Sequence, residues 1–405
     1  MKVADPRISI IMSNYNGEQF IEHTIISVLN QTYTDYEFII IDDCSTDRSR
    51  SIIDSFDDTR IRKVYFDNNE HMCYAFNYAI SIARGEYYAR IDSDDYWHPD
   101  KLKKQMEYME GHPGCGACFT LVNVVDEKGT FLTEDDTDRV RLFEVDNRSR
   151  AEWIKYFYFH GSCLCHPSVL MRKEAIETVG VYNYSLVQIQ DFELWIRIVK
   201  KYEIYVIQER LTNYRWLRSG ENASAPSETV NRRSEAEFAY VLSRYFDDIS
   251  DELFIAAFSE EFIKKDARSH ERLLCEKALM LLRPVFCGYP GKIGGIVKLV
   301  GLIQNEDTRK ILREEYKFTQ KSIYELTTSP IFYDVTMENR LKECEQKIIL
   351  YTKKLEEYER ENETLKEFAL CADVLHHQME DLKAQLGKRK LSNKVKGIKD
   401  KLVKK

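Results

Sequence analysis

The sequence predicts an α/β fold in which a mostly parallel sheet carries helices on both faces, followed by a helical region and a C-terminal coiled coil. Three observations predict this fold. In the first third of the chain, short apolar runs alternate with stretches of helical periodicity, the pattern of βαβ units. Beyond about residue 218 the periodicity is helical. From 341 to 386 apolar residues recur at alternating spacings of three and four, as in coiled coils.

The expected elements follow in order along the chain. The first strand, Ile8–Met12, ends in the loop sequence SNYNG, and a helix then extends to about Asn30. The second strand, Glu37–Ile41, ends in DDCSTD, where we expect a capping residue for the next helix among Ser45, Thr46 and Asp47. The remaining expectations are strands at 62–66, 86–91, 117–125 and 202–208, and helices at 74–83, from about Pro99, at 229–246, 251–265 and 269–282.

Polar clusters follow the strands of the expected sheet. They are SNYNG, DDCSTD and, after the strand 86–91, DSDD. Ligands of parallel sheets bind beyond the carboxyl ends of the strands, so we expect these three clusters side by side along one edge.

The DSDD cluster places Asp92, Asp94 and Asp95 within four residues. Like charges at such spacing repel and raise one another's pKa, so a cation is expected among them. Mg²⁺ and Mn²⁺ prefer oxygen ligands, and magnesium commonly takes one or two carboxylates together with substrate phosphates. The cluster therefore predicts a divalent cation and a phosphorylated ligand. The alternative is a solvated strand end without a site.

Composition narrows the class of protein. With 405 residues, 43% hydrophobic and 31% charged, the chain is typical of soluble proteins, and it lacks an apolar run of about 18 residues that would span a membrane. The N-terminus lacks the zones of a signal peptide, so we expect a cytoplasmic protein with reduced cysteines.

Cys115 and Cys118 have the spacing of a zinc site, but their apolar surroundings favour buried thiols. The segment GYPGKIGG lacks the spacing of a phosphate loop.

The C-terminal quarter of the chain predicts self-association and membrane attachment. Heptads over 336–386 place Asn362 at a core-type position, which favours a homodimer over a single helix that packs on the rest of the same chain. Residues 387–405 carry nine Lys or Arg against one acid, with Leu391, Val395, Ile398 and Leu402 on one helical face. This pattern indicates a peripheral attachment to an anionic membrane surface, here the inner face of the cell membrane. We expect no nucleic acid partner, because aromatic residues are absent from the tail. A disordered solubilising tail is the alternative.

The motifs, taken in order, resemble those of the family-2 inverting glycosyltransferases with a GT-A (Rossmann-like) fold. The matching segments are SIIMSNYNG, EFIIIDDCSTD, NYAISIARGEYYARIDSDD, HPSVLMRKEAIETVGVYNYSL, QDFELWIRI and YRWLRSGENAS, which together run from Ile8 to about Ser224. The resemblance implies a mixed, mostly parallel sheet. It also divides the chain into a GT-A domain at 1–225, a helical region at 226–335, the coiled coil at 336–386 and the basic tail at 387–405.

The resemblance implies roles for single residues. Asp191 matches the catalytic base and Asp95 the metal ligand, while the residues that match nucleotide-sugar contacts are Ser13, Tyr15, Asp43, Asp92 and Asp94. His160 and His166 are expected to be structural. The family often has Arg before the Asn that matches Asn77, but here the residue is Phe76, and its closing histidine is Leu217. The positive charge missing at Phe76 is expected from Arg84, Arg90 or another group, and in place of the histidine at Leu217 the expected diphosphate contact is Arg215 or Arg218.

The expected function is therefore inverting, metal-dependent transfer of a sugar, UDP-linked by expectation, to a hydroxyl of a glycan or lipid-linked acceptor in cell-surface polysaccharide synthesis. A nucleotidyltransferase is the first alternative, but SNYNGEQF lacks the Lys or Arg that such an enzyme needs. The second alternative is a catalytically inactive nucleotide-sugar-binding scaffold organised by the coiled coil. It is suggested by Phe76 and Leu217, the two departures from the family pattern.

Overall fold

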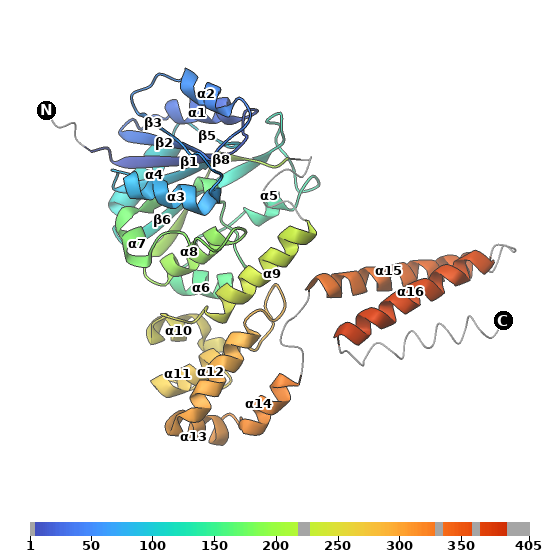
Figure 1. Cartoon of the computed structure of the whole chain (residues 1–405). Coiled ribbons are helices and arrows are strands. Elements are labelled where there is room, and N and C mark those ends of the chain that lie inside the picture. The colour runs from blue at the N-terminus through green and yellow to red at the C-terminus, as the bar shows by residue number, and fades with distance from the viewer. Residues whose placement is uncertain (1–4, 218–226, 329–334, 359–364, 387–405) are drawn as a thin grey trace. The chain divides into compact units, whose positions relative to one another are not determined.

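The computed structural model describes residues 5–217, 227–328, 335–358 and 365–386. Two compact units divide the chain (Figure 1). The sheet unit comprises Met1–Pro226 and Tyr245–Arg268, and the helical unit comprises Ser227–Arg244 and Ser269–Lys405. Among the described residues, none of the helices is long and apolar enough to cross a membrane.

The sheet unit is built on eight strands in the order β3-β2-β1-β4-β7-β6-β8-β5. Strands β1 to β4 pair in parallel, as do β6 and β8, while β7 and β5 run antiparallel to their neighbours. The mixed, mostly parallel sheet is thus confirmed. The strands are β1 Ile8–Asn14, β2 Tyr36–Asp42, β3 Ile61–Tyr65, β4 Tyr87–Asp92, β5 Tyr96–Trp97, β6 Cys115–Val125, β7 Leu170–Arg172 and β8 Glu203–Arg215.

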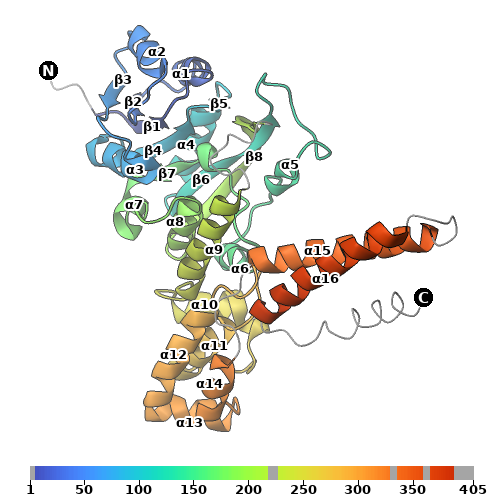
Figure 2. The ribbon, with the colours of Figure 1, turned by 45° about the vertical axis from the view of Figure 1, so that its right-hand side comes forward.

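Helices cover both faces of this sheet, because successive side chains of each strand point to opposite faces (Figure 2). Ile8, Ile10 and Met12 of β1 share a buried cluster with residues of α1, α2 and α4. On the other face, Arg90 of β4 lies over the ring of Phe76 in α3, and Phe119 of β6 packs edge-on against Trp195 in α8. The helices involved are α1 Ile21–Leu29, α2 Ser49–Ser55, α3 His71–Ile82, α4 Lys101–Gly111 and α8 Gln190–Val199.

Residues 245–268 belong to the sheet unit although helical segments precede and follow them in the other unit. The Tyr245 hydroxyl donates to the Ile154 carbonyl at 2.6 Å, and Tyr158 packs against Phe246 and Phe258. These aromatic contacts fix α10 on α6. The remaining helical elements of this unit are α5 Arg139–Leu142, α6 Arg150–His160, the 3₁₀ turn His166–Ser168, α7 Lys173–Val179, α10 Asp251–Phe258 and the 3₁₀ turn Ser259–Glu261.

The helical unit has its own core, in which Cys275 and Leu279 of α11 pack with Leu299 and Ile303 of α12. Its helices are α9 Glu228–Ser243, α11 His270–Met280, α12 Lys292–Gln304, α13 Glu306–Glu314, α14 Gln320–Thr327, α15 Val335–Tyr358 and α16 Leu365–Leu386. Helices α15 and α16 lie along each other (Figures 1 and 2), with Leu341 and Met379 buried between them.

The strands and helices expected from the sequence are present, with differences at their ends. The strand expected at 202–208 extends to Arg215, and the helix expected at 251–265 ends at Phe258. The cap of α2 is Arg48 rather than one of the three expected residues, although Asp47 Oδ1 accepts the Ser49 N–H at 2.9 Å. The two heptad registers correspond to α15 and α16. Part of their apolar surface is buried where these two helices of one chain pack together. The coiled coil and the homodimer stay predictions, and Asn362 and the basic tail lie outside the described residues.

Candidate active site

The three polar clusters meet at one edge of the sheet, as expected. Ser13 at the end of β1 is level with Asp92 of β4, and Asn14 is level with Asp42 of β2. Parallel pairing in register thus brings together loops that are up to 80 residues apart along the chain. Residues from SNYNG, DDCSTD and DSDD therefore line a single edge.

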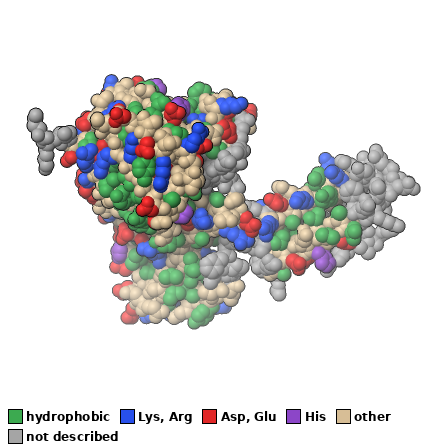
Figure 3. Space-filling view, turned by 45° about the horizontal axis from the view of Figure 1, so that its top comes forward, with side chains coloured by type: hydrophobic (Ala, Val, Ile, Leu, Met, Phe, Trp, Pro, Cys, Tyr) green, Lys and Arg blue, Asp and Glu red, His purple; other side chains and the backbone are tan. Residues whose placement is uncertain are grey.

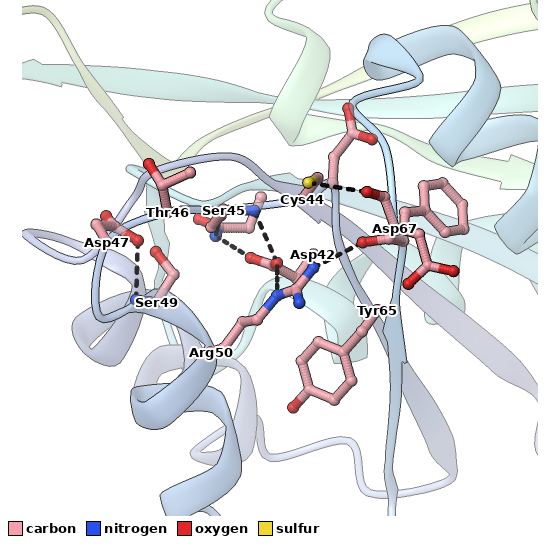
Figure 4. A network of polar contacts seen from close by, with 12 residues as sticks. Asp42, Cys44, Ser45, Thr46, Asp47, Ser49, Arg50, Tyr65 and Asp67 are labelled. Carbon is pink, nitrogen blue, oxygen red and sulfur yellow. Dashed lines mark hydrogen bonds and ion pairs between the residues drawn. The ribbon is translucent and has the colours of Figure 1, made fainter.

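A network of hydrogen bonds holds the first two loops together. Asn14 Nδ2 donates to Asp42 Oδ2 at 3.0 Å. Arg50 Nε donates to Asp42 Oδ1 at 2.7 Å (Figure 4). The Ser45 N–H also donates to Asp42 Oδ1, at 3.0 Å. Gly17 is required in this network because an added Cβ would lie 2.2 Å from Asn14 Oδ1. Asp42 is completely buried and serves the loop scaffold.

The residues expected to contact the nucleotide lie beside this scaffold. The Tyr15 side chain is 53% exposed, so its ring is accessible to a planar ligand. Asp43 follows the buried Asp42, and its Oδ1 accepts the Glu70 N–H at 2.8 Å. Ser13 is partly buried at the end of β1. Asp43 is itself buried, at 2% exposed, so the choice of Asp43 over Asp42 as the ligand-facing acid stays a prediction.

The three acids of DSDD have different surroundings. Asp92 is the most accessible, with 31% of its side chain exposed, and it pairs with Arg90 Nη2 at 2.7 Å. Asp94 is partly exposed, and its carbonyl accepts Arg215 Nε at 2.7 Å. Asp95 is buried, and its Oδ1 accepts the Arg215 N–H at 2.7 Å, but its Oδ2 has no hydrogen-bond partner among the described residues.

Burial and mutual repulsion perturb two of these acids. Burial, followed by the charge of Asp92, raises the pKa of Asp94 to about 7. Burial and the charges of Asp94 and Asp92 raise the pKa of Asp95 well above its usual range. An unpartnered buried oxygen among crowded carboxylates is costly unless a positive group satisfies it. The donor set therefore fits a hard divalent cation.

Protein side chains alone do not complete such a site. Within the part of the chain that the structure describes, there is no group of three or more His, Cys, Asp or Glu side chains that could hold a metal ion. A cation at this edge thus needs ligand oxygens from elsewhere, as magnesium bound to substrate phosphates does.

Asp191 lies at the first turn of α8, where the helix dipole favours an acid. Its Oδ1 accepts the Phe192 N–H at 2.7 Å, and its Oδ2 lies 3.8 Å from His166 Nδ1. Burial is the main cause that raises the pKa of Asp191 to about 6, and the positive charge of Arg90 opposes that rise. A carboxylate with this pKa is ionised near pH 7 and basic enough to accept a proton.

Arg90 connects the two groups of acids. It is 2% exposed, its guanidinium lies 4.1 Å from the centroid of the Phe76 ring, and it pairs with Asp92. It also contacts the His166 ring, and Asp191 is among the charges that raise the pKa of Arg90. The buried guanidinium of Arg90 thus lies over Phe76, the position at which the family often has Arg.

The sequence offered Arg84 or Arg90 for that charge, and Arg215 or Arg218 in place of the closing histidine; strand periodicity relates Arg90 to the acids. Arg90 precedes Asp92 by two residues, so both side chains leave the same face of β4. Of the other three, Arg84 pairs with the buried Glu37 at the start of β2. Arg215 is buried and donates to backbone carbonyls, and Arg218 lies outside the described residues.

The two histidines differ in place. His160 is exposed at the end of α6. His166 is buried within the site, where its Nε2 lies 2.8 Å from the Tyr182 hydroxyl. Burial, followed by the charge of Arg90, holds the pKa of His166 well below its usual range, so the ring is neutral. It forms part of the wall beside Asp191.

A side-chain amide links the first half of the unit to the segment that leads to Asp191. Asn77 Nδ2 donates to the Tyr182 carbonyl at 2.8 Å, and the Tyr182 N–H donates to Asn77 Oδ1 at 3.0 Å. These two bonds position Tyr182 beside His166. The sequence motif identified Asn77. Its partner Tyr182 lies far along the chain, and no local sequence pattern indicates that the two residues bond to each other.

Cys115 and Cys118, the pair with zinc-site spacing, lie buried in β6, and none of the ten cysteines is in a disulfide. Among the described residues they do not belong to a group of three or more His, Cys, Asp or Glu side chains that could hold a metal ion. Burial raises the pKa of Cys115 to about 12, so its thiol is protonated. These residues behave as small apolar side chains, as the surroundings in the sequence indicated.

Comparison with known proteins gives a consistent result. The family model "Glycosyl transferase family 2" matches residues 9–180. The glycosyltransferase TuaG of Bacillus subtilis, provisionally assigned to teichuronic acid biosynthesis, is 33% identical over 213 residues, which are 52% of this chain and 79% of that protein.

A second relative is the UDP-Glc:alpha-D-GlcNAc-diphosphoundecaprenol beta-1,3-glucosyltransferase WfaP of Escherichia coli. It is 33% identical over 196 residues, which are 48% of this chain and 70% of that protein. Among solved structures, residues 1–349 of TarS from S. aureus superpose with a TM-score of 0.48 at 15% identity, covering 77% of this chain and 91% of that chain.

Proposed function

This chain belongs to glycosyl transferase family 2, and from that premise we propose that it is an inverting enzyme that transfers a sugar from a nucleotide-sugar, a UDP-sugar, to a hydroxyl group. One observation carries the proposal: Asp92 of the DSDD cluster and Asp191 both interact with the same buried arginine, Arg90. An edge with a place for a cation and a diphosphate thus adjoins a carboxylate that is basic near pH 7.

In this proposal Asp191 is the catalytic base. In an inverting transfer the acceptor hydroxyl attacks the anomeric carbon from the side opposite the leaving diphosphate, and one carboxylate takes the hydroxyl proton. The pKa of about 6 keeps Asp191 ionised at neutral pH. The Phe192 N–H bonds to its carboxylate and orients it, with the neutral ring of His166 3.8 Å away.

The donor occupies the edge formed by the loops after β1, β2 and β4. Tyr15 stacks near the base and Asp43 hydrogen-bonds it, with Ser13 beside them, while Asp92 and Asp94 hold the sugar and ribose side. Asp95, with its unpartnered Oδ2, is proposed as the metal ligand, and Asp94 is the more accessible alternative. A bound Mg²⁺ or Mn²⁺ would act as a Lewis acid that stabilises the departing diphosphate.

We propose a glycan or lipid-linked acceptor in cell-surface polysaccharide synthesis. The names of two relatives support it, one for teichuronic acid biosynthesis and the other for a diphosphoundecaprenol-linked sugar. Attachment of the basic tail, 387–405, to the inner face of the membrane belongs to the same proposal. So does a homodimer formed through 336–386.

The test is release of UDP from UDP-sugars in the presence of Mn²⁺ and a hydroxyl acceptor, starting with a panel of donors. Asp191→Asn is expected to bind the donor with parental affinity and to lose about 10²- to 10⁴-fold in rate. Glu193→Gln is the matched control, because Glu193 lies on the same helix but pairs with Arg197 at 2.7 Å. Full activity of Asp191→Asn contradicts the assignment of the base.

The inactive scaffold remains the competing function, and Phe76 and Leu217 are the two residues that suggest it. We propose that Arg90, which lies over the Phe76 ring, supplies the charge absent at Phe76. Leu217, the other residue that suggests an inactive scaffold, is buried shortly after the end of β8. Donor binding without UDP release, in the parental chain and with every sugar of the panel, would favour the scaffold.

A further inference from the structure

Hydrophobic side chains, tyrosines included, gather in patches on the surface of the sheet unit (Figure 3). Four neighbouring aromatic rings lie on α3 and on the segments beside it. The Phe66 ring lies edge-on to the rings of Tyr74 and Tyr78, at centroid distances of 5.7 and 5.4 Å. The Tyr74 ring in turn lies 6.2 Å from that of Tyr184. The three tyrosines are 42%, 38% and 61% exposed. The α3 platform is defined as Phe66, Tyr74, Tyr78 and Tyr184.

Phe66 connects the platform to the donor side of the site. Its N–H donates to the Asp42 carbonyl at 2.9 Å, and Arg50 Nη2 donates to its carbonyl at 2.6 Å. Asp42 and Arg50 belong to the hydrogen-bond network that holds the first two loops together. The platform therefore begins beside the edge at which the nucleotide is proposed to bind.

Tyr184 lies on the segment that leads to Asp191. The Leu186 N–H donates to the Asn183 carbonyl at 3.2 Å, so the Tyr184 ring projects from a closed turn. The Leu186 carbonyl also accepts from the Cys73 thiol of α3, at 3.1 Å, which holds the turn on that helix. A ring that is already fixed loses little conformational freedom when a ligand binds. The platform thus extends from the donor edge to the side of the site that carries the proposed base.

The exposure of these rings contrasts with that of Tyr65 at the end of β3. Tyr65 is 37% exposed, but its hydroxyl donates to Asp54 Oδ1 and its ring lies under the Arg50 guanidinium, so it has a structural role. Among the residues that the structure describes, no protein group bonds to the three tyrosine hydroxyls of the platform. These hydroxyls are therefore available to a ligand.

The charges around the platform exclude some ligands. Residues 66–83 and 180–190 contain no Lys or Arg, and their acids are Asp67 and Glu70. Arg50, which contacts the Phe66 carbonyl, is paired with the buried Asp42. Anionic lipid headgroups and nucleic acids are bound through Lys and Arg, so this surface disfavours both.

Uncharged polar side chains border the rings. Asn68 and Asn69 follow Phe66 and are exposed, and Asn183 and Ser185 flank Tyr184. Amides and hydroxyls both donate and accept hydrogen bonds. A sugar ring matches such a surface, because its C–H face covers an aromatic ring while its hydroxyls reach the polar border. Successive units of a glycan are spaced similarly to neighbouring rings of the platform.

We propose that the α3 platform binds the sugar units of a glycan acceptor that lie beyond the reacting hydroxyl. Their C–H faces stack on the rings of Tyr74 and Tyr184, and their hydroxyls bond to the amides and hydroxyls at the border. This inference rests on the proposed transfer to a glycan. It adds the surface that distinguishes a chain of sugars from a single sugar.

The first test measures glycan binding without turnover. Maltoheptaose, cellohexaose and chitohexaose are titrated into the full chain with UDP and Mn²⁺ present, and NMR gives the affinity. The parent is expected to bind at least one of them. Tyr74→Ala combined with Tyr184→Ala, the alanine pair, is expected to weaken this binding about tenfold or more, because two stacking surfaces are lost. Tyr74→Phe combined with Tyr184→Phe keeps both rings and is expected to retain most of the affinity.

Tyr324→Ala on α14 is the matched control, because the parental side chain is 66% exposed and lies outside the sheet unit. It is expected to bind with parental affinity. Absence of binding to all three oligosaccharides, or equal binding by the parent and the alanine pair, overturns the proposal. A loss of UDP affinity in the alanine pair would assign the rings to the nucleotide and also overturns it. Tyr184→Ala alone, on a surface turn, gives the same comparison if the pair is unstable.

The second test compares acceptors by length in the UDP-release assay. The alanine pair is expected to raise the KM of the oligosaccharide that binds by about tenfold more than the KM of the methyl glycoside of its single unit. Equal increases in the two KM values overturn the proposal. Oligosaccharide binding without UDP release contradicts the proposed transfer and not the platform. Transfer to the oligosaccharide with an unchanged KM in the alanine pair contradicts the platform and not the transfer.

Discussion

Arg90→Gln separates the electrostatic role of Arg90 from mere packing. The arginine is 2% exposed, contacts Asp92 and His166, and opposes the rise in the pKa of Asp191. Its removal is expected to raise the pKa of Asp191 further, because the carboxylate loses a favourable charge in a buried place. The base works only when ionised, so the acid limb of the rate profile must move to higher pH.

The size of the effect follows from the pKa of about 6 for Asp191. Loss of one nearby opposite charge shifts a buried carboxylate by about one unit or more. At pH 6 the ionised fraction then falls from about one half to about one tenth, a loss of about fivefold. At pH 8 the fraction stays above about nine tenths in both proteins, so the rates converge.

The assay is the pH dependence of kcat for UDP release between about pH 5 and 9, a range that brackets the expected pKa. Arg90→Lys restores the positive charge and is expected to return the acid limb toward its parental position. Arg62→Gln is the matched control, because Arg62 pairs with Glu37 at 2.7 Å in the same sheet but near the start of β2. A loss of rate that is equal at every pH would refute the reasoning and leave Arg90 with a packing role alone.

Three further predictions concern the cation, the core and the tail. Asp95→Ala is expected to weaken Mn²⁺-dependent UDP binding more than Asp94→Ala in calorimetric titrations, and the reverse order would move the ligand to the more accessible acid. Lys101→Met is expected to stabilise the sheet unit by on the order of 2 kcal/mol at neutral pH, since burial lowers the pKa of Lys101 to about 7, while the lost bond to Gln105 and the lost contact with the Trp97 ring oppose the gain. The unfolded chain binds this proton at higher pH than the folded one, so the advantage of Lys101→Met in thermal unfolding must grow as pH falls from about 10.5 to about 7 and then stay constant. Removal of 387–405 is expected to reduce the binding of anionic vesicles, and unchanged binding would contradict a lipid-binding role of the tail.

The parts of the fold that follow from local patterns were predictable. Strands β1, β2 and β4 are short apolar runs with polar ends, and their parallel pairing follows from the helices between them. The return of 245–268 to the sheet unit was not predictable, because it depends on contacts of Tyr245 and Phe246 with α6 that only the folded chain creates. Heptad spacing likewise does not distinguish two helices that pair within one chain from helices that pair between chains.

The candidate site divides in the same way. The acids at strand ends were found because a parallel sheet gathers its carboxyl ends. The contacts among Arg90, His166 and Tyr182 were not found, since β4, the 3₁₀ turn and the following loop meet only in three dimensions. Nor did the motif show that Arg215 is committed to the carbonyls of Asp94 and Asp126 rather than to a ligand.

The two ties between distant segments, Asn77 with Tyr182 and Arg215 with Asp94 and Asp95, bear on engineering. Between them lies the segment 126–190, the proposed acceptor side of the site, which is held at one end by a hydrogen bond from the Arg215 guanidinium to the Asp126 carbonyl and near the other by the Asn77 amide. A cassette with these boundaries is thus the natural unit to exchange between relatives. Asn77 and Arg215 both bond to backbone atoms of this segment, at Tyr182 and Asp126, so an exchanged segment with the same backbone course can keep both ties while the donor edge and Asp191 stay in place.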